Sequence, residues 1–445
     1  MPAGESPSLL QRILRFGRLA SVLLLAAGQM FPERAGTDQP WPRRREEPAA
    51  RTGIEPAFLT GDVAAKKVLV GPVGHASVSA GSADSLLRRA AATPGLISLA
   101  GGLPDARLFP KQALGRALLR ALDVRGSAAL QYGWPEGLRD VRQHVAERLR
   151  QRGANVEAEQ VIVTSGAQQA ILLALATLGR CASVGVDAET YPGALAAFRS
   201  RNARLVGRDQ AADAYYVMPA IGNPRGQSMS AHDRASLLER LRREAAYAIE
   251  DDAYEATAFS GESPRPLLAE LPQRIFHVGT FSKTLCPGLR IGWLVPPPSF
   301  LARALKRKQT QDIEANGLGQ ALLAEYLNGD DFERRLGRAR RCYRLKAQAL
   351  CDAVHRHLPQ FRFEPPRGGF SLWLESDLRC DEMRLLQAAI EHGVSFDLGS
   401  SFRFEPSDRL GLRLCFSSAA AGELEAGVAR LADALRAVLR REHAA

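Results

Sequence analysis

The sequence has few cysteines and no pattern in which they could hold a metal or build a disulfide framework. Its six cysteines are scattered over residues 181–415, none belongs to a Cys-x-x-Cys pair, and no cluster of histidines accompanies them. This spacing argues against a zinc site and against a small disulfide-stabilised fold, and it is typical of a reducing compartment. We therefore predict no bound metal and a cytoplasmic location.

The sequence also lacks a hydrophobic run long enough for a membrane span. Residues 19–27 are apolar and follow three arginines, but a spanning helix needs about 20 such residues. The run could belong to a signal peptide, although a short amphipathic helix or a start codon placed too far upstream is favoured. Residues 40–56 are rich in Pro, Arg and Glu without periodicity. We predict that residues 1–80 form a poorly structured extension or linker.

Charge of one sign is in excess, because the chain carries a net charge of +11. The excess is mostly arginine and is spread over helical stretches such as residues 334–341, which favours solvated helix faces over a nucleic-acid groove. The first 80 residues show no helix-turn-helix pattern with a recognition helix. Nucleic acid is therefore an unfavoured partner.

Strands and helices alternate between about residues 130 and 297. This alternation predicts an α/β fold with a mostly parallel central sheet and helices on both faces. A long helical region follows, from about residue 299 to 358, and then a shorter mixture of strands and helices. The candidate strands of the sheet are residues 160–164, 182–186, 215–218, 246–250, 275–279 and 290–295.

The length of 445 residues is enough for two domains and a sizeable core. After the extension we predict an N-terminal arm in residues 81–125 that packs with the smaller domain. Residues 126–300 form the predicted large domain. Residues 301–445 form a connecting long helix and a smaller α+β domain.

A single lysine stands among small residues directly after an apolar strand. Lys283 lies in the segment from Gly279 to Trp293, with Ser282 before it and Arg290 after it. Such a lysine can form an imine with an aldehyde cofactor, and neighbouring hydroxyls with an arginine can hold a phosphate. Ser-Lys is nevertheless a common dipeptide, and alone it would indicate an exposed surface lysine.

Other motifs combine strand ends with polar side chains. The run Thr-Ser-Gly-Ala-Gln-Gln from Thr164 leads from a strand into a helix, whose N-terminal N–H groups can bind an anion. Asp251 closes a strand, and Arg413 is the one charge in an apolar strand, where it must be paired. A substrate carboxylate is a suitable partner for that arginine.

In their order, these motifs resemble those of class I/II aminotransferases, pyridoxal-phosphate enzymes of fold type I. The sequence is most similar to the 2-aminoadipate aminotransferase branch and to the aminotransferase half of MocR-type regulators. The resemblance extends from about Ser82 to the C-terminus and includes at least six motifs. It implies pyridoxal 5'-phosphate bound in the large domain, amino acid and 2-oxo acid substrates, and a homodimer with shared sites.

The resemblance also implies a role for each matching residue. Lys283 would hold the cofactor as an imine and move the proton as general base and acid. The cofactor phosphate would be contacted by Ser165, Gly166, Ala167, Gln168, Thr280, Ser282 and Arg290, and in the partner subunit by Tyr132. The ring would be contacted by Tyr191, Asn223, Asp251 and Tyr254, and the substrate by Gly101, Gly102 and Arg413.

Two departures from the family pattern stand out. Arg225 replaces the threonine of Asn-Pro-Thr-Gly, and the stretch between Tyr191 and Asn223 is short, as if a strand–helix piece were trimmed. We predict transamination as the activity. The alternatives are a MocR/GntR-like transcriptional regulator, a pyridoxal-phosphate enzyme of another type such as a C–S lyase or decarboxylase, and an inactive scaffold.

Overall fold

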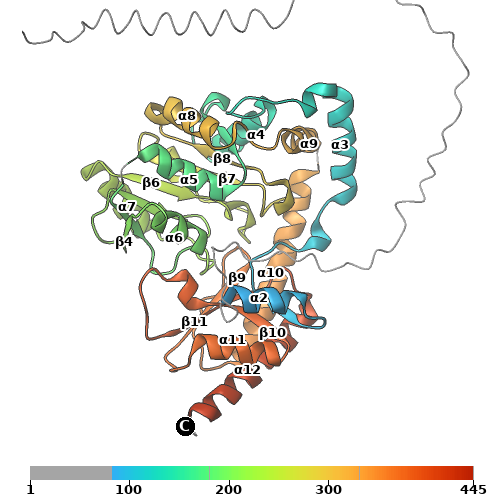
Figure 1. Ribbon diagram of the computed structural model, residues 1–445, viewed down its shortest axis with the longest axis vertical. Coiled ribbons are helices and arrows are strands. Elements are labelled where there is room, and N and C mark those ends of the chain that lie inside the picture. The colour runs from blue at the N-terminus through green and yellow to red at the C-terminus, as the bar shows by residue number, and fades with distance from the viewer. Residues whose placement is uncertain (1–82, 180, 330, 444–445) are drawn as a thin grey trace, which may run out of the picture. The chain divides into compact units, whose positions relative to one another are not determined.

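The computed structural model describes residues 83–179, 181–329 and 331–443 (Figure 1). Residues 1–80, to which the predictions of an extension, of a possible signal peptide and of a missing helix-turn-helix refer, lie outside the described residues. The larger sheet has the spatial order β2-β8-β7-β6-β5-β3-β4. Its strands are β2 (Ile162–Thr164), β3 (Ser183–Val186), β4 (Arg204–Gly207), β5 (Ala214–Val217), β6 (Tyr247–Asp251), β7 (Ile275–Thr280) and β8 (Gly292–Val295).

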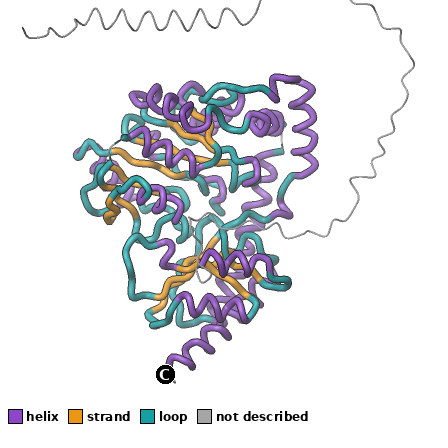
Figure 2. Tube along the Cα trace, viewed as in Figure 1, coloured by secondary structure: helices purple, strands orange, loops and turns teal. Residues whose placement is uncertain are grey.

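The larger sheet is mostly parallel, as predicted, because only β8 runs antiparallel to its neighbours β2 and β7. Helices pack on both faces of this sheet (Figure 2). The helices are α3 (Lys111–Arg125), α4 (Arg139–Gln151), α5 (Ala167–Leu178), α6 (Pro192–Arg199), α7 (Ala231–Arg243), α8 (Leu301–Asp312) and α9 (Gly317–Leu327).

Both faces of this sheet are buried, since successive side chains of a strand point to opposite faces. In β5, Tyr215 packs in the core cluster that includes α4 and α7, whereas Tyr216 packs in the cluster that includes α5, α6 and α8. The parallel strands β3, β5, β6 and β7 all end at one edge of the sheet. This edge is where α/β folds bind their ligands.

The edge strand β4 is present, although the sequence suggested that a strand–helix piece had been trimmed. What is missing is a helix between β4 and β5, which are joined by residues 208–213 alone. Parallel strands usually need a crossover of a dozen or more residues. The short crossover is held by Asp213, whose Oδ2 accepts hydrogen bonds from the backbone N–H groups of Ala182 and Ser183, both at 2.8 Å.

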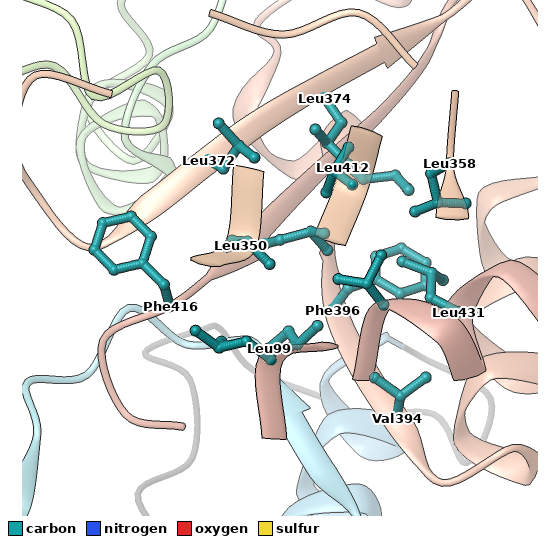
Figure 3. Packing of buried hydrophobic residues seen from close by; sticks show 14 of the residues in the cluster. Leu99, Leu350, Leu358, Leu372, Leu374, Val394, Phe396, Leu412, Phe416 and Leu431 are labelled. Carbon is teal, nitrogen blue, oxygen red and sulfur yellow. The ribbon is translucent and has the colours of Figure 1, made fainter. Parts of the chain in front are cut away.

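The smaller sheet has the order β1-β10-β11-β9. Its strands are β1 (Ile97–Leu99), β9 (Ser371–Ser376), β10 (Val394–Leu398) and β11 (Leu410–Cys415), and its helices are α2 (Ala83–Ala92), α10 (Phe332–His357), α11 (Glu382–Glu391) and α12 (Ala421–His443). Leu350 of α10, Phe396 of β10 and Leu431 of α12 meet in its core (Figure 3). The parallel pairing of β1 with β10 brings the start of the described chain beside its C-terminal part.

The predicted helical region of residues 299–358 is divided rather than continuous. Its first helix, α8, ends before Ile313, which has a left-handed φ of 61°. The next helix, α9, begins at a side-chain cap, because Asn316 Oδ1 accepts a hydrogen bond from Gly319 N at 2.9 Å. A capping asparagine and a residue with a left-handed φ both interrupt helices. Hydrophobic periodicity over a long stretch of sequence does not reveal such single-residue breaks.

Candidate active site

Lys283 lies in the loop that follows β7, and its side chain is half-buried. The Nζ atom donates a hydrogen bond to Gly102 O at 3.1 Å and lies 5.2 Å from the centroid of the Tyr254 ring. Burial, and then the charge of Arg413, lower the pKa of Lys283 to about 8. A substantial fraction of the amine is therefore neutral near physiological pH, which makes it a nucleophile.

The turns after β2 and β7 meet because both strands pair with β8. Gly292 of β8 is the register partner of Thr164 at the end of β2 and of Thr280 at the end of β7. A Cβ at Gly292 would lie 2.7 Å from Gly166 C, so only glycine allows the two turns to approach. This contact brings the predicted phosphate residues of both segments together.

The predicted phosphate residues Ser165, Gly166, Ala167 and Gln168 lie at the start of α5. Gly166 has a φ of 92°, and Ala167 and Gln168 open the helix behind it. Arg290 Nη2 donates to Ser165 O at 3.0 Å, which places a guanidinium at the same turn. Free N–H groups, the helix dipole and an arginine together form an anion site.

Three side chains that the sequence analysis did not single out support this turn. Gln169 Oε1 accepts from Ser165 N at 2.6 Å, while Gln169 Nε2 donates to Asp312 Oδ2 at 2.7 Å. Lys308, which is fully buried, donates to Asp312 Oδ1 at 2.6 Å. The side-chain amide of Gln168 points to α6 instead and donates to Gly193 O at 2.8 Å. Asp312 and Lys308 lie far from this turn in the sequence, so only the folded structure reveals their role.

On the neighbouring strand ends, Thr280 and Ser282 lie within one hydrogen-bond network. Thr280 Oγ1 donates to Ser282 Oγ at 3.0 Å, and Ser282 N donates back to Thr280 Oγ1 at 3.1 Å. Both residues are buried. Their hydroxyls therefore lie beside the loop that carries Lys283, and their contact with the cofactor phosphate stays a prediction.

Asp251 lies at the end of β6 and is buried. It accepts a hydrogen bond from Tyr216 Oη at 2.6 Å and another from Ala253 N at 3.0 Å. Burial raises the pKa of Asp251 above its usual range, although these two donors act against the rise. Tyr216 was missed by the sequence analysis. The available signal was a tyrosine in a fully buried strand, because a buried hydroxyl needs a partner.

Two predicted aromatic residues lie beside Asp251. Tyr191 caps α6, and burial, with a contribution from the charge of Asp251, raises the pKa of Tyr191 to about 12. Tyr254 is buried, and its burial raises its pKa as well. Both phenols therefore stay protonated at neutral pH and can donate a hydrogen bond.

Arg413 makes three hydrogen bonds within the protein. Its Nε and Nη2 atoms donate to Asp397 Oδ2 at 2.9 and 2.7 Å, and its Nη1 atom donates to Asn223 Oδ1 at 2.9 Å. The side-chain N–H groups of Asn223 remain available as donors. The sequence predicts a substrate carboxylate as the partner of this buried charge, and Asp397 is an internal partner in addition.

The turn at Gly101 and Gly102 connects the two sides of the site. Gly101 N donates to Asp397 Oδ2 at 3.0 Å, Gly102 N donates to Cys415 Sγ at 3.2 Å, and Gly102 O accepts from Lys283. Both glycines have a positive φ, of 88° and 57°. The turn therefore contacts the lysine through Gly102 and lies beside the arginine, and its contact with a substrate stays a prediction.

Tyr132 is apart from the other predicted site residues. It follows the short helix Gly126–Leu130, its side chain is 78% exposed, and no contact in the described chain joins it to the cluster. Arg225, the departure from the family motif, is ion-paired with Glu189 at 2.7 Å and leaves the side chain of Asn223 in place.

The described residues contain no group of three His, Cys, Asp or Glu side chains that could hold a metal ion. Within the same ranges, every helix is too short or too polar to cross a bilayer.

The family model for aminotransferase class I and II matches residues 105–431. The chain belongs to the class I and II aminotransferases. This aminotransferase is 34% identical over 370 residues to the 2-aminoadipate transaminase of Thermus thermophilus, and the match covers 78% of this chain and 91% of the relative. It is 28% identical over 412 residues to the probable rhizopine catabolism regulatory protein MocR of Rhizobium meliloti. That match covers 88% of this chain and 83% of the relative.

A solved structure shares the fold of this aminotransferase. It is the alpha-aminoadipate aminotransferase LysN of Thermus thermophilus, complexed with N-(5'-phosphopyridoxyl)-L-leucine, with a TM-score of 0.73 and 31% identity. The match covers 80% of this chain and 95% of the other. The predicted family, the α/β fold of type I and the transaminase class are confirmed.

Proposed function

We propose that this protein is a pyridoxal-phosphate-dependent aminotransferase that moves an amino group from an amino acid to a 2-oxo acid. The observation that carries the proposal is the position of Lys283. Its half-buried amine, with a pKa lowered to about 8, donates a hydrogen bond to Gly102 O of the Gly101–Gly102 turn. A lysine so placed is a nucleophile and not a surface charge.

The residues of the site fit pyridoxal phosphate. The phosphate would be held by the N-terminus of α5 with Arg290, where a Cβ on Gly166 would already lie 2.8 Å from Arg290 Nη2. The buried carboxylate of Asp251 would stand opposite the ring nitrogen. When bound, this cofactor supplies an electron sink for the bonds at the substrate Cα.

The chain's own groups would then carry out the proton transfers and the orientation. The amine of Lys283 would take a proton from the substrate Cα and pass it to the cofactor. It can do both because its pKa lies close to neutral. Tyr216 would hold Asp251 in the ionised state by donating to its Oδ2 atom. Arg413 would orient the substrate through its α-carboxylate, with Asn223 fixing the guanidinium.

A homodimer with shared sites is part of the proposal. Tyr132 and Trp134 are 78% and 76% exposed, and Leu119, Val124 and Leu130 nearby in sequence are exposed as well. An apolar surface of this kind marks an interaction site. A second copy of the chain would cover it and bring Tyr132 to the phosphate of the partner's site.

We also place the protein in the cytoplasm. The thiols of Cys181, Cys286, Cys342, Cys351 and Cys415 are all free. Free thiols in this number suit a reducing compartment.

A transcriptional regulator is the second candidate, because the match to MocR covers most of both chains. The two candidates differ in what the protein does with an amino acid. The test is to incubate the purified protein, loaded with pyridoxal phosphate, with a panel of amino acids and 2-oxoglutarate, and to measure glutamate. Glutamate from at least one donor, lost in Lys283→Ala, is expected. Release of CO2 or sulfide without glutamate would indicate a decarboxylase or a C–S lyase, and no turnover with specific DNA binding would favour the regulator.

A further inference from the structure

The register of the smaller sheet places a carboxylate directly opposite Arg413. Asp397 of β10 and Arg413 of β11 are Cα partners in the antiparallel pair. Both residues are buried, with 8% and 7% of their surface exposed. Asp397 Oδ2 accepts from Nε and from Nη2 of the guanidinium, so the carboxylate binds the side of Arg413 and not its end.

The contacts of Arg413 leave one edge for a ligand. A guanidinium has five N–H groups, and here three of them are taken by Asp397 and Asn223. One N–H remains on each of Nη1 and Nη2, and N–H groups on these two atoms can together receive a carboxylate. Gly102 lies over this edge, since an added Cβ would be 3.5 Å from both nitrogens.

Asp397 is held in place by groups other than Arg413. Gly101 N donates to both of its oxygens, at 3.1 and 3.0 Å, and Cys415 Sγ lies 3.6 Å from Oδ2. The carboxylate therefore does not depend on Arg413 alone for its position. A ligand that binds the remaining edge meets an ion pair of zero net charge, with a fixed negative charge beside it.

We propose that Asp397 is a specificity-determining residue that weakens the hold of Arg413 on a substrate α-carboxylate. The inference rests on the proposed function, in which Arg413 binds that carboxylate. Like charges at short range in a buried site repel each other strongly. The protein therefore discriminates less between an amino acid and the corresponding amide or amine than a site with an unopposed arginine would.

The test compares two small probes, propionate and propionamide, which differ only in the charged group. Their dissociation constants are measured by NMR titration of the protein loaded with pyridoxal phosphate, as wild type and as three variants. Asp397→Asn keeps the shape of the side chain and removes its charge. Asp252→Asn is the matched control, because Asp252 is also a buried carboxylate paired with an arginine. Its Oδ2 atom lies 2.8 Å from Arg152 Nη1. Arg413→Met removes the cation itself.

We expect Asp397→Asn to bind propionate at least about tenfold more tightly, with propionamide unchanged within about twofold. Asp252→Asn should leave both affinities unchanged. Weaker or equal propionate binding in Asp397→Asn, with propionate binding still dependent on Arg413, would overturn the inference and leave the proposed function standing. Propionate binding that survives Arg413→Met would overturn the inference together with the role proposed for Arg413, whereas the glutamate assay would still decide the proposed function.

The wild-type protein gives a second measurement that needs no substitution. If Asp397 offsets the charge of Arg413, propionate should bind less than about tenfold more tightly than propionamide. A preference above that value would contradict the proposal even if Asp397→Asn failed to fold.

Discussion

Lys283 can act as a nucleophile at neutral pH only because the protein lowers its pKa. Burial is the larger cause, and the charge of Arg413 adds to it. A lysine in water would be almost wholly protonated at pH 7, and its amine would be unreactive. Burial of Lys283 therefore has a kinetic consequence that can be measured without any substrate.

The uptake of pyridoxal phosphate by the cofactor-free protein should depend on pH. Below a pH of about 8 the neutral fraction of the Lys283 amine rises about tenfold per pH unit, and above it the fraction levels off. The uptake rate, followed by stopped-flow absorbance, should show the same rise and plateau. Arg413→Met should move the inflection to higher pH, because it removes a charge that lowers the pKa. A wild-type rate that still climbs tenfold per unit above pH 9 would contradict the lowered pKa.

Replacing Tyr216 by phenylalanine should change the titration of Asp251. The Tyr216 hydroxyl donates to the carboxylate and lowers its pKa, so its loss raises the pKa of Asp251 further. We expect kcat/KM to fall about tenfold, as one buried hydrogen bond to a charged group is lost. The acid limb of the pH profile should shift to higher pH.

The matched control is Tyr215→Phe. Tyr215 is the next residue of β5 but faces the opposite side of the sheet, where its hydroxyl contacts Gln210 O and Glu244. This variant should leave the acid limb unchanged. An equal shift in both variants would show that the effect comes from strand packing and not from Asp251.

Residues that belong to contiguous motifs could be predicted from the sequence, and residues that act across strands could not. Lys283, Gly166 and Asp251 each follow a strand within a short local pattern. Asp397 pairs with Arg413 through the register of β10 and β11, and Tyr216 meets Asp251 through the pairing of β5 with β6. Register depends on the whole sheet, so a local pattern does not contain it.

At the scale of elements, the short connection between β4 and β5 is the most unusual feature of the larger sheet. Tyr215 covers β3 at Gly185, where an added Cβ would lie 2.4 Å from the Tyr215 ring. The ring is fully buried and cannot move away easily. A glycine is therefore required at this point of the sheet.

Gly185→Ala should lower the free energy of unfolding by about 1–3 kcal/mol, because it overpacks a filled core. Chemical denaturation of the purified protein measures this change. Gly422→Ala is the control, since a Cβ there meets nothing within 4 Å. It lies in α12 and should leave stability unchanged or raise it by up to about 1 kcal/mol. If Gly185→Ala were as stable as the wild type, the Tyr215 ring would be able to move away from β3, and a glycine would not be required there.

The alternation of strands and helices made the larger sheet predictable, including its mostly parallel character. The helical region of residues 299–358 was less predictable, because Ile313 and Asn316 interrupt it without a proline. The absence of a helix between β4 and β5 showed in the sequence only as a short spacing. The presence of strand β4 could not be predicted from the sequence. An isolated run of four residues pairs as an edge strand only when β3 is beside it.

At the scale of the whole molecule, the exposed apolar surface around Tyr132 and Trp134 predicts a dimer. Light scattering should give a mass close to twice the 48.3 kDa of one chain. Trp134→Glu places a charge in the predicted interface and should give monomers with much reduced activity. A wild-type monomer at micromolar concentration would contradict this prediction.

Mixing one inactive variant with one weakened variant tests whether the sites are shared. In a heterodimer of Lys283→Ala with Tyr132→Phe, one site keeps both an intact Lys283 and an intact Tyr132 if the tyrosine comes from the partner subunit. Activity should therefore return on mixing. If Tyr132 serves its own site, no site of the heterodimer is intact and mixing restores nothing.

We expect Lys283 to be the residue that binds pyridoxal phosphate covalently. The most direct measurement is the visible spectrum of the purified protein with added pyridoxal phosphate, followed by borohydride reduction and mass spectrometry of the peptides. We predict a lysine-bound absorbance band that is absent in Lys283→Ala, and a phosphopyridoxyl group on Lys283 after reduction. A band that persists in Lys283→Ala, or a label on another lysine, would contradict the account.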